Sequence, residues 1–156
     1  MSFKDYTQRV NQHLDKHLST QGSLREAMRY SVLSGGKRFR PILTYAVANT
    51  FGTAINLADS SACAVELIHA YSLIHDDLPA MDDDDIRHNQ PACHKQFGEA
   101  QAILAGDGLQ ALAFEVLTND GGLSAQVRIT LLQALTHAAF EMAEGQSIDL
   151  SVVSKT

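Results

Sequence analysis

The segment LIHDDLPAMDDDDIRHNQ, residues 73–90, carries six aspartates within ten positions at the end of an apolar stretch. Hard divalent cations bind carboxylate oxygens, and Mg²⁺ is usually held by one or two carboxylates together with substrate phosphates. On an ideal helix Asp76 and Asp82 would lie about 240° apart and could not share one ion. Pro79 disfavours helical geometry at itself and at the residue before it, so a kink or loop can bring Asp82 back to Asp76. The segment is therefore a candidate divalent-cation site.

Two plainer interpretations of the aspartates stay open. Runs of like charge most often form a solvated loop or helix end. A calcium-binding EF-hand loop is the second, but the segment lacks the glycine and the distal glutamate at the spacing that such a loop requires. The cation site is favoured because the aspartates follow a predicted buried helix and because a basic, phosphate-compatible segment occurs elsewhere in the chain.

That basic segment is SGGKRFRP, residues 34–41. Its glycines allow a ligand to approach the backbone, and Lys37 and Arg40 follow at the start of a predicted helix, whose N-terminus favours an anion. Taken alone, the segment is more typical of an ordinary basic turn. On the helix before the aspartates, His69 lies within about 20° of Asp76 and about 10 Å from it along the axis, so we expect both to face one cleft.

Carboxylates for a metal ion and cationic side chains for a phosphate together indicate a phosphorylated substrate. The sequence contains no Walker motif and no glycine loop of the kinase type. A cleft between helices would have apolar walls, and a diphosphate with an apolar tail fits such a cleft.

Helices must position these residues, because apolar residues recur at helical spacing along most of the chain. The pattern predicts helices over residues 3–18, 23–36, 40–52, 59–77, 99–117 and 124–150. Ser23 and Glu26 stand in the register of a capping box. The helix that ends at the aspartates is apolar on nearly every side, so we expect it at the centre of the molecule. The predicted fold class is all-α, with antiparallel helices around this central helix.

The composition is that of a globular domain with its own core, since 45% of the 156 residues are hydrophobic and 19% are charged. The net charge of -6 argues against a nucleic-acid binder, which would need a basic face. No apolar run reaches about 18 residues and the N-terminus lacks an apolar signal core, so we expect no membrane span and no export signal. Cys63 and Cys93 lack metal-site spacing, which suits a reducing cytoplasm.

Three segments, in this order, resemble the trans-prenyl diphosphate synthase family, and its bacterial farnesyl diphosphate synthases in particular: GGKRFRP, ELIHAYSLIHDDLPAMDDDDIRHNQPACHKQFGEAQAILAGDGLQ and GQSIDL. The resemblance implies that residues 1–156 form the N-terminal part of a polyprenyl synthase domain, with helices around a central apolar cleft. It also implies an Mg²⁺ cofactor, isopentenyl diphosphate and an allylic diphosphate (dimethylallyl or geranyl) as substrates, and a cytoplasmic homodimer.

The resemblance assigns roles to the residues around the aspartates. Asp76, Asp77 and Asp82 fall on the family's first aspartate-rich motif, in which Asp76 and Asp82 bind Mg²⁺. Arg87 falls on an arginine that holds the allylic diphosphate. The implied reaction is ionisation of the allylic C–O bond, followed by attack of the isopentenyl double bond on the allylic cation and loss of a proton.

The isopentenyl diphosphate pocket falls, by the same resemblance, on the basic segment and on the central helix. Its residues are Lys37, Arg40 and His69. His88 stands where the family usually has a second arginine that helps to bind isopentenyl diphosphate, and this departure leaves its effect open.

Two further pairs of residues follow from the resemblance. Gln146 and Asp149 fall on helix residues that line the allylic site. Tyr71 and Ser72 precede the aspartates where bulky side chains close the product pocket in this family. Tyr71 therefore favours a farnesyl product over geranylgeranyl diphosphate, although ideal helical spacing places it well off the face of Asp76.

Other functions stay open. The family continues beyond the length of this chain with a second aspartate-rich motif, and Lys155–Thr156 comes too soon after Gln146 to match the family's lysine–threonine pair. The chain is therefore expected to be either a fragment of a synthase or a short protein with another role, such as a catalytically inactive regulatory module. A terpene cyclase is disfavoured by Lys37, Arg40 and His69, because a cyclase binds no isopentenyl diphosphate.

Overall fold

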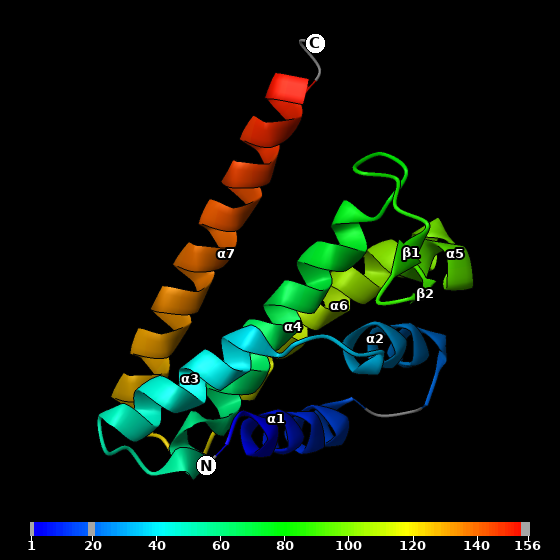
Figure 1. Cartoon of the computed structure of the whole chain (residues 1–156). Coiled ribbons are helices and arrows are strands. Elements are labelled where there is room, and N and C mark those ends of the chain that lie inside the picture. The colour runs from blue at the N-terminus through cyan, green and yellow to red at the C-terminus, as the bar shows by residue number, and fades with distance from the viewer. Residues whose placement is uncertain (1, 19–20, 154–156) are drawn as a thin grey trace.

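The computed structural model describes residues 2–18 and 21–153, so Lys155–Thr156 lie outside the described residues. Over the described part the regular secondary structure is helical apart from one short hairpin, which confirms the predicted all-α fold (Figure 1). The elements are α1 (Phe3–His17), α2 (Ser23–Leu33), α3 (Phe39–Thr50), the short 3-10 helix η1 (Ile55–Ala58), α4 (Asp59–Asp76), β1 (Ile86–Arg87), β2 (Gln90–Pro91), α5 (Cys93–Phe97), α6 (Glu99–Thr118) and α7 (Ala125–Val153).

Helix α4 is the centre of the molecule, as its apolar sequence predicts. It packs most extensively against α6, which runs in the opposite direction, and also contacts α1, α2, α3 and α7 (Figure 1). Ten of its 18 residues are buried. The residues at its C-terminal end are therefore held by a helix that is fixed on several sides.

The approach of α6 to α4 depends on small residues of α6. Ala102 and Ala105 of α6 are fully buried. A Cβ atom placed on Gly106 would lie 2.2 Å from Nε2 of His75 on α4. The same nitrogen lies 3.1 Å from the carbonyl oxygen of Ile103, so the imidazole occupies the space that a larger residue at position 106 would need.

A buried ion pair fixes the basic segment before α3. Arg38, with a left-handed φ of 52°, donates to Glu66 Oε1 of α4 at 2.8 Å. It also donates to the carbonyl oxygen of Val32 at 2.6 Å and to Asn11 Oδ1 at 2.8 Å. Only 6% of Arg38 is exposed, so this arginine ties the segment to α1, α2 and α4 and is not free to bind a ligand.

The N-terminus of α2 differs from the prediction. Its N-cap is Gly22, with φ of 92° and no side-chain cap, and Ser23 is already the first helical residue. The Ser23 hydroxyl therefore lies one position too late to cap the helix, and the predicted capping box is wrong.

Residues 77–92 form a compact connection between α4 and α5. The Asp82 N–H donates to the carbonyl oxygen of Asp76 at 2.9 Å, so the chain turns back at Pro79 as predicted. A hairpin follows in which Arg87 pairs with Gln90 and Ile86 with Pro91. Each strand is only two residues long, which is too short to produce an alternating pattern in the sequence.

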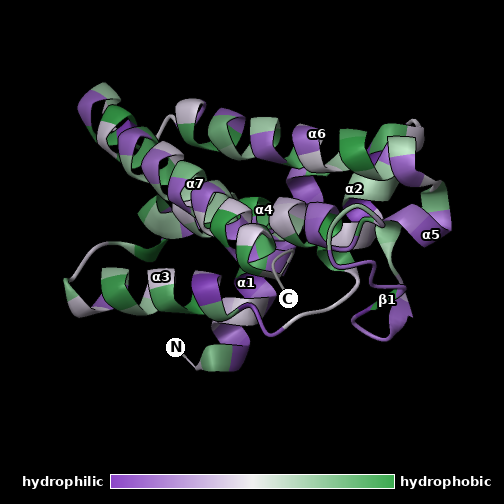
Figure 2. Ribbon diagram, turned by 90° about the horizontal axis from the view of Figure 1, so that it is seen from above, coloured by the Kyte–Doolittle hydropathy of each residue, from purple (hydrophilic) through white to green (hydrophobic). Residues whose placement is uncertain are grey.

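Helices α3 and α7 each leave several apolar side chains exposed. Figure 2 shows apolar positions along both helices as well as in the centre. The exposed residues are Phe39, Leu43 and Val47 on α3 and Val127, Ile129, Phe140, Ile148 and Val152 on α7. Among the described residues, no helix is both long enough and apolar enough to cross a bilayer.

Both cysteines are free and buried. Cys63 lies in α4, where burial raises the pKa of its thiol to about 12. Burial likewise raises the pKa of Cys93, the first residue of α5. Neither thiol is therefore a reactive group in the folded protein.

Candidate active site

A basic cavity of about 580 Å³ lies beside α4 and collects the residues predicted to bind isopentenyl diphosphate. Lys37, Arg40, His69 and His88 all line it, together with the two glycines that precede Lys37. Burial and the nearby Arg40 lower the pKa of His69. His69 therefore acts mainly as a neutral donor or acceptor there, and Lys37 and Arg40 supply charge that suits an anion.

A second cavity, of about 350 Å³, lies between α4 and α7. It is lined by Asp76, Tyr71, Ser72 and Gln146, and its remaining walls include methionine and leucine side chains. The ring of Tyr71 packs edge-on against His75, with centroids 5.3 Å apart. Tyr71 thus reaches this cavity although it lies about 140° from Asp76 on an ideal helix, because Ser72 and His75 continue the same face of α4 between them.

Asp149 differs from its predicted partner Gln146. It is exposed on α7 and does not line the second cavity. The two positions are only about 60° apart around a helix, and Asp149 falls just outside the arc of α7 residues that lines the cavity.

The two cavities also separate His69 from Asp76. His69 lines the basic cavity and Asp76 lines the second one, so the cleft that the two residues are expected to share stays a prediction. They lie on one helical face, but the roughly 10 Å between them along the axis is enough to reach from one cavity to the next.

Asp76 and Asp82 have the electrostatics of an incomplete cation site. Partial burial raises the pKa of Asp76, and the neighbouring carboxylates of Asp82 and Asp77 raise it further. A divalent cation would remove this penalty, since it compensates both the burial and the like-charge repulsion. The donor set of carboxylate oxygens therefore fits Mg²⁺.

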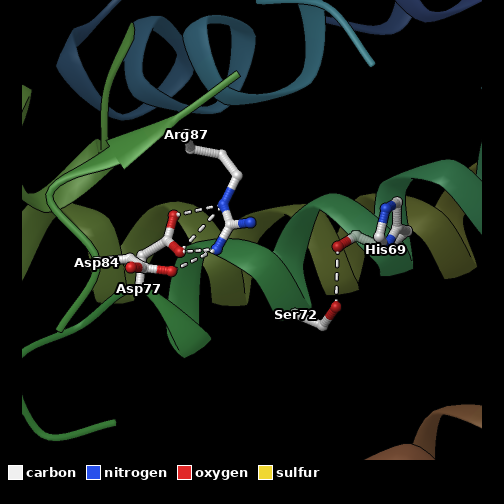
Figure 3. A network of polar contacts seen from close by, with 5 residues as sticks. All are labelled: His69, Ser72, Asp77, Asp84 and Arg87. Carbon is white, nitrogen blue, oxygen red and sulfur yellow. Dashed lines mark hydrogen bonds and ion pairs between the residues drawn. The ribbon is translucent and has the colours of Figure 1, made fainter. Parts of the chain in front are cut away.

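Asp77 is placed differently from its neighbour. Only 2% of it is exposed, and it accepts hydrogen bonds from the guanidinium of Arg87. Figure 3 shows Arg87 directed at Asp77 and Asp84, beyond His69 and Ser72 along α4; the Asp84 contact is 3.3 Å. The hydrogen bonds to Asp77 raise the pKa of Arg87. In this structure Asp77 orients Arg87 on the hairpin, and it does not line the second cavity with Asp76.

The sequence interpretation missed one acidic residue of the basic cavity. Glu66 lines it but is held by Arg38. The signal available was its spacing, since Glu66 stands three residues before His69 and so on a neighbouring part of the same helical face.

The chain is similar to known proteins over most of its length. Residues 21–156 match the family model Polyprenyl synthetase. Farnesyl diphosphate synthase from Haemophilus influenzae is 47% identical over 95% of this chain and 54% of its own length. A chloroplastic geranylgeranyl pyrophosphate synthase from Catharanthus roseus is 45% identical over 90% of this chain and 41% of its own length. A geranyltransferase structure from Legionella pneumophila superposes with a TM-score of 0.93, at 45% identity, over 99% of this chain and 57% of that one.

The chain therefore belongs to the polyprenyl synthetase family. It spans about half the length of the curated relatives that it matches.

Proposed function

We propose that this chain is the N-terminal part of a prenyltransferase that condenses isopentenyl diphosphate with dimethylallyl or geranyl diphosphate to give farnesyl diphosphate. The observation that carries the proposal is the pair of cavities beside α4. One is lined by cationic side chains, and the other combines Asp76 with apolar walls. Isopentenyl diphosphate can thus bind on one side of α4, and the allylic diphosphate can bind on the other side with its hydrocarbon tail against the apolar walls.

The proposed reaction begins at the allylic C–O bond, whose electron pair leaves with the diphosphate. Mg²⁺ bound by Asp76 and Asp82 would neutralise charge on that leaving group. Arg87, oriented by Asp77, adds a fixed positive charge. Lys37 and Arg40 position isopentenyl diphosphate, whose double bond forms the new C–C bond with the allylic cation. A proton then passes to the released diphosphate, and the apolar walls keep water from the cation.

The product length is proposed to be farnesyl because Tyr71 lines the second cavity. Geranylgeranyl diphosphate is the alternative product, and the relative from Catharanthus roseus favours it. A terpene cyclase stays the weaker candidate, since the basic cavity holds four residues suited to a second diphosphate.

A different class of function is a catalytically inactive helical module that binds a complete synthase. The exposed apolar residues of α3 and α7 favour it, because such surfaces commonly mark interfaces. We also propose a homodimer, for the same reason, and a cytoplasmic location, which suits two free thiols.

The test uses this chain joined to the C-terminal half of the Haemophilus influenzae relative, a fusion that we call the completed enzyme. Product formation from isopentenyl and geranyl diphosphates with Mg²⁺ is measured by chromatography. Lys37→Ala is expected to raise the KM for isopentenyl diphosphate by roughly tenfold or more, since a charge-assisted hydrogen bond is lost. Lys16→Ala, which removes the same charge far from the basic cavity, should change nothing. A rise in the KM of the allylic substrate alone would show that the cavity is assigned to the wrong diphosphate.

A further inference from the structure

Asp83, Asp85 and His94 form a cluster that the proposed reaction does not use. Each offers one ligand atom, and the three atoms lie within 4.8 Å of one another. Asp83 and Asp85 belong to the connection after α4 and are exposed, whereas His94 lies in α5 and is 6% exposed. None of the three residues is one of the proposed Mg²⁺ ligands Asp76 and Asp82, although Asp83 directly follows Asp82 in the sequence.

His94 supplies the observation that makes this more than a group of acidic residues. Both of its ring nitrogens are buried and have no hydrogen-bond partner in the described part of the chain. Buried polar atoms without a partner are rare in folded proteins because they lose the hydrogen bonds of water. The unpartnered ring nitrogens of His94 therefore indicate that a ligand is missing at this place, where the carboxylates of Asp83 and Asp85 are close by.

The backbone holds the two aspartates in place. The Asp83 N–H donates to the carbonyl oxygen of Leu78 at 3.2 Å, and the Asp85 carbonyl accepts from the Ala92 N–H at 2.8 Å. The second of these bonds joins the two ends of the hairpin beside α5. Only the exposed carboxylate groups need to rotate for the three ligand atoms to converge.

We propose that Asp83, Asp85 and His94 bind a divalent cation of the zinc class, at a site separate from the proposed Mg²⁺ site. One imidazole nitrogen with two carboxylate oxygens is a ligand set that Zn²⁺ accepts, whereas Mg²⁺ prefers oxygen alone. Bonds of about 2.0–2.2 Å require ligand atoms closer together than 4.8 Å, so the carboxylates move inward on binding. Water completes the coordination on the exposed side.

Lys95 competes with the ion. Its Nζ lies 2.8 Å from Oδ1 of Asp85, so a bound cation must displace the ammonium group or use the other carboxylate oxygen. Removing this lysine should therefore tighten Zn²⁺ binding, while removing a ligand should weaken it. The two opposite effects distinguish a specific site from general attraction to an acidic loop.

The ion would join the connection after α4 to α5, across the hairpin that carries Arg87 and His88. It would act as a structural cross-link that holds these two side chains beside the cavities. Zinc at roughly 100 times its dissociation constant is then expected to raise the melting temperature by roughly 5–10 °C.

The experiment measures Zn²⁺ binding to the purified protein by calorimetry in an excess of Mg²⁺, with Co²⁺ absorption as a report on coordination. Asp83→Asn, at an exposed position, should lower the affinity by roughly tenfold or more and remove the thermal shift. Asp84→Asn removes the same charge from the same loop and should leave Zn²⁺ binding unchanged. Lys95→Gln should raise the affinity.

Three results would overturn the proposal. The first is equal affinity in Asp83→Asn and the parent protein. The second is loss of binding in Asp76→Asn or Asp82→Asn with full binding in Asp83→Asn, which places the ion at the proposed Mg²⁺ site. The third is loss of binding only in His13→Gln, which removes a half-buried histidine of α1 that lies 3.3 Å from Asp59 and so places the ion there.

Discussion

Asp76 and Asp82 bring two like charges together at the end of α4, where the carboxylate of Asp82 raises the free energy of the ionised form of Asp76. In the completed enzyme, Asp76→Asn or Asp82→Asn is expected to lower kcat by roughly 100-fold or more, because the leaving diphosphate loses its metal ion. The melting temperature should stay the same or rise, since repulsion is relieved. Steady-state kinetics and a melting curve check both parts. Asp120→Asn, which removes an equal charge outside both cavities, is the control, and near-normal turnover in either site variant contradicts the metal assignment.

Tyr71 lines the second cavity, and we propose that it limits the depth of that cavity. Replacing its ring by a methyl group in Tyr71→Ala opens the wall next to His75, so the completed enzyme should release products longer than farnesyl diphosphate. Chromatography of the extracted products measures this. Ser72→Ala changes little volume and should keep the parent product. If Tyr71→Ala also makes only farnesyl diphosphate, the end of the cavity lies at another residue.

Glu66 neutralises Arg38 inside the protein. Glu66→Gln keeps the shape but leaves the guanidinium without a counter-charge, so we expect unfolding to become easier by about 3–5 kcal/mol. Urea denaturation gives the free energy of unfolding. Asp15→Asn removes the partner of Arg29 in an exposed pair and should cost about 0–1 kcal/mol. Equal losses in the two variants would mean that the buried Arg38–Glu66 pair contributes no more to the free energy of unfolding than the exposed Arg29–Asp15 pair does.

At the scale of the helices, the contact of α6 with α4 depends on Gly106. Gly106→Ala places a methyl group where the His75 ring stands, so either the ring or the helix must move. We expect a loss of about 1–3 kcal/mol in the free energy of unfolding, as for other overpacked sites. Gly145→Ala is the matched control, since a Cβ atom there meets nothing within 4 Å. It should be neutral or stabilising by up to about 1 kcal/mol through helix propensity. A neutral Gly106→Ala would mean that α4 and α6 separate easily.

The sequence predicts the long helices well because their apolar periodicity extends over many residues. It also predicts the turn of Asp82 back to Asp76, since Pro79 acts through local backbone sterics. Short elements cannot be predicted from apolar periodicity. The hairpin and α5 contain too few residues to show a period, and the choice of Gly22 over Ser23 as N-cap depends on where the loop before α2 enters.

The sequence predicts which residues belong to the candidate site better than it predicts how they lie relative to one another. Lys37, Arg40, His69 and His88 do line one cavity. Their sequence spacing could not reveal that Asp77 turns away to orient Arg87, because that contact depends on the hairpin ten residues later. Long-range pairings of this kind are set by tertiary packing.

At the scale of the whole molecule, the 156-residue chain spans about half of its relatives. We predict that it forms no condensation product by itself, because the family's second aspartate-rich motif is not among its residues and the second cavity would stay open to water. Incubation of the purified chain with both diphosphates and Mg²⁺, followed by product extraction, tests this against an enzyme-free blank. The completed enzyme is the positive control. Product above the blank from the chain alone would contradict the prediction.

The labelling rates of the two buried thiols report how often different parts of the protein unfold. A thiol reagent can label Cys63 only when α4 loses its neighbours, so its rate of labelling follows unfolding of the whole molecule. Cys93 sits in a five-residue helix beside the hairpin, and its labelling follows the release of that corner alone. A time series of mass spectra gives both labelling rates. Faster labelling of Cys93 than of Cys63 would show how often the segment that carries Arg87 and His88 detaches while the centre stays folded.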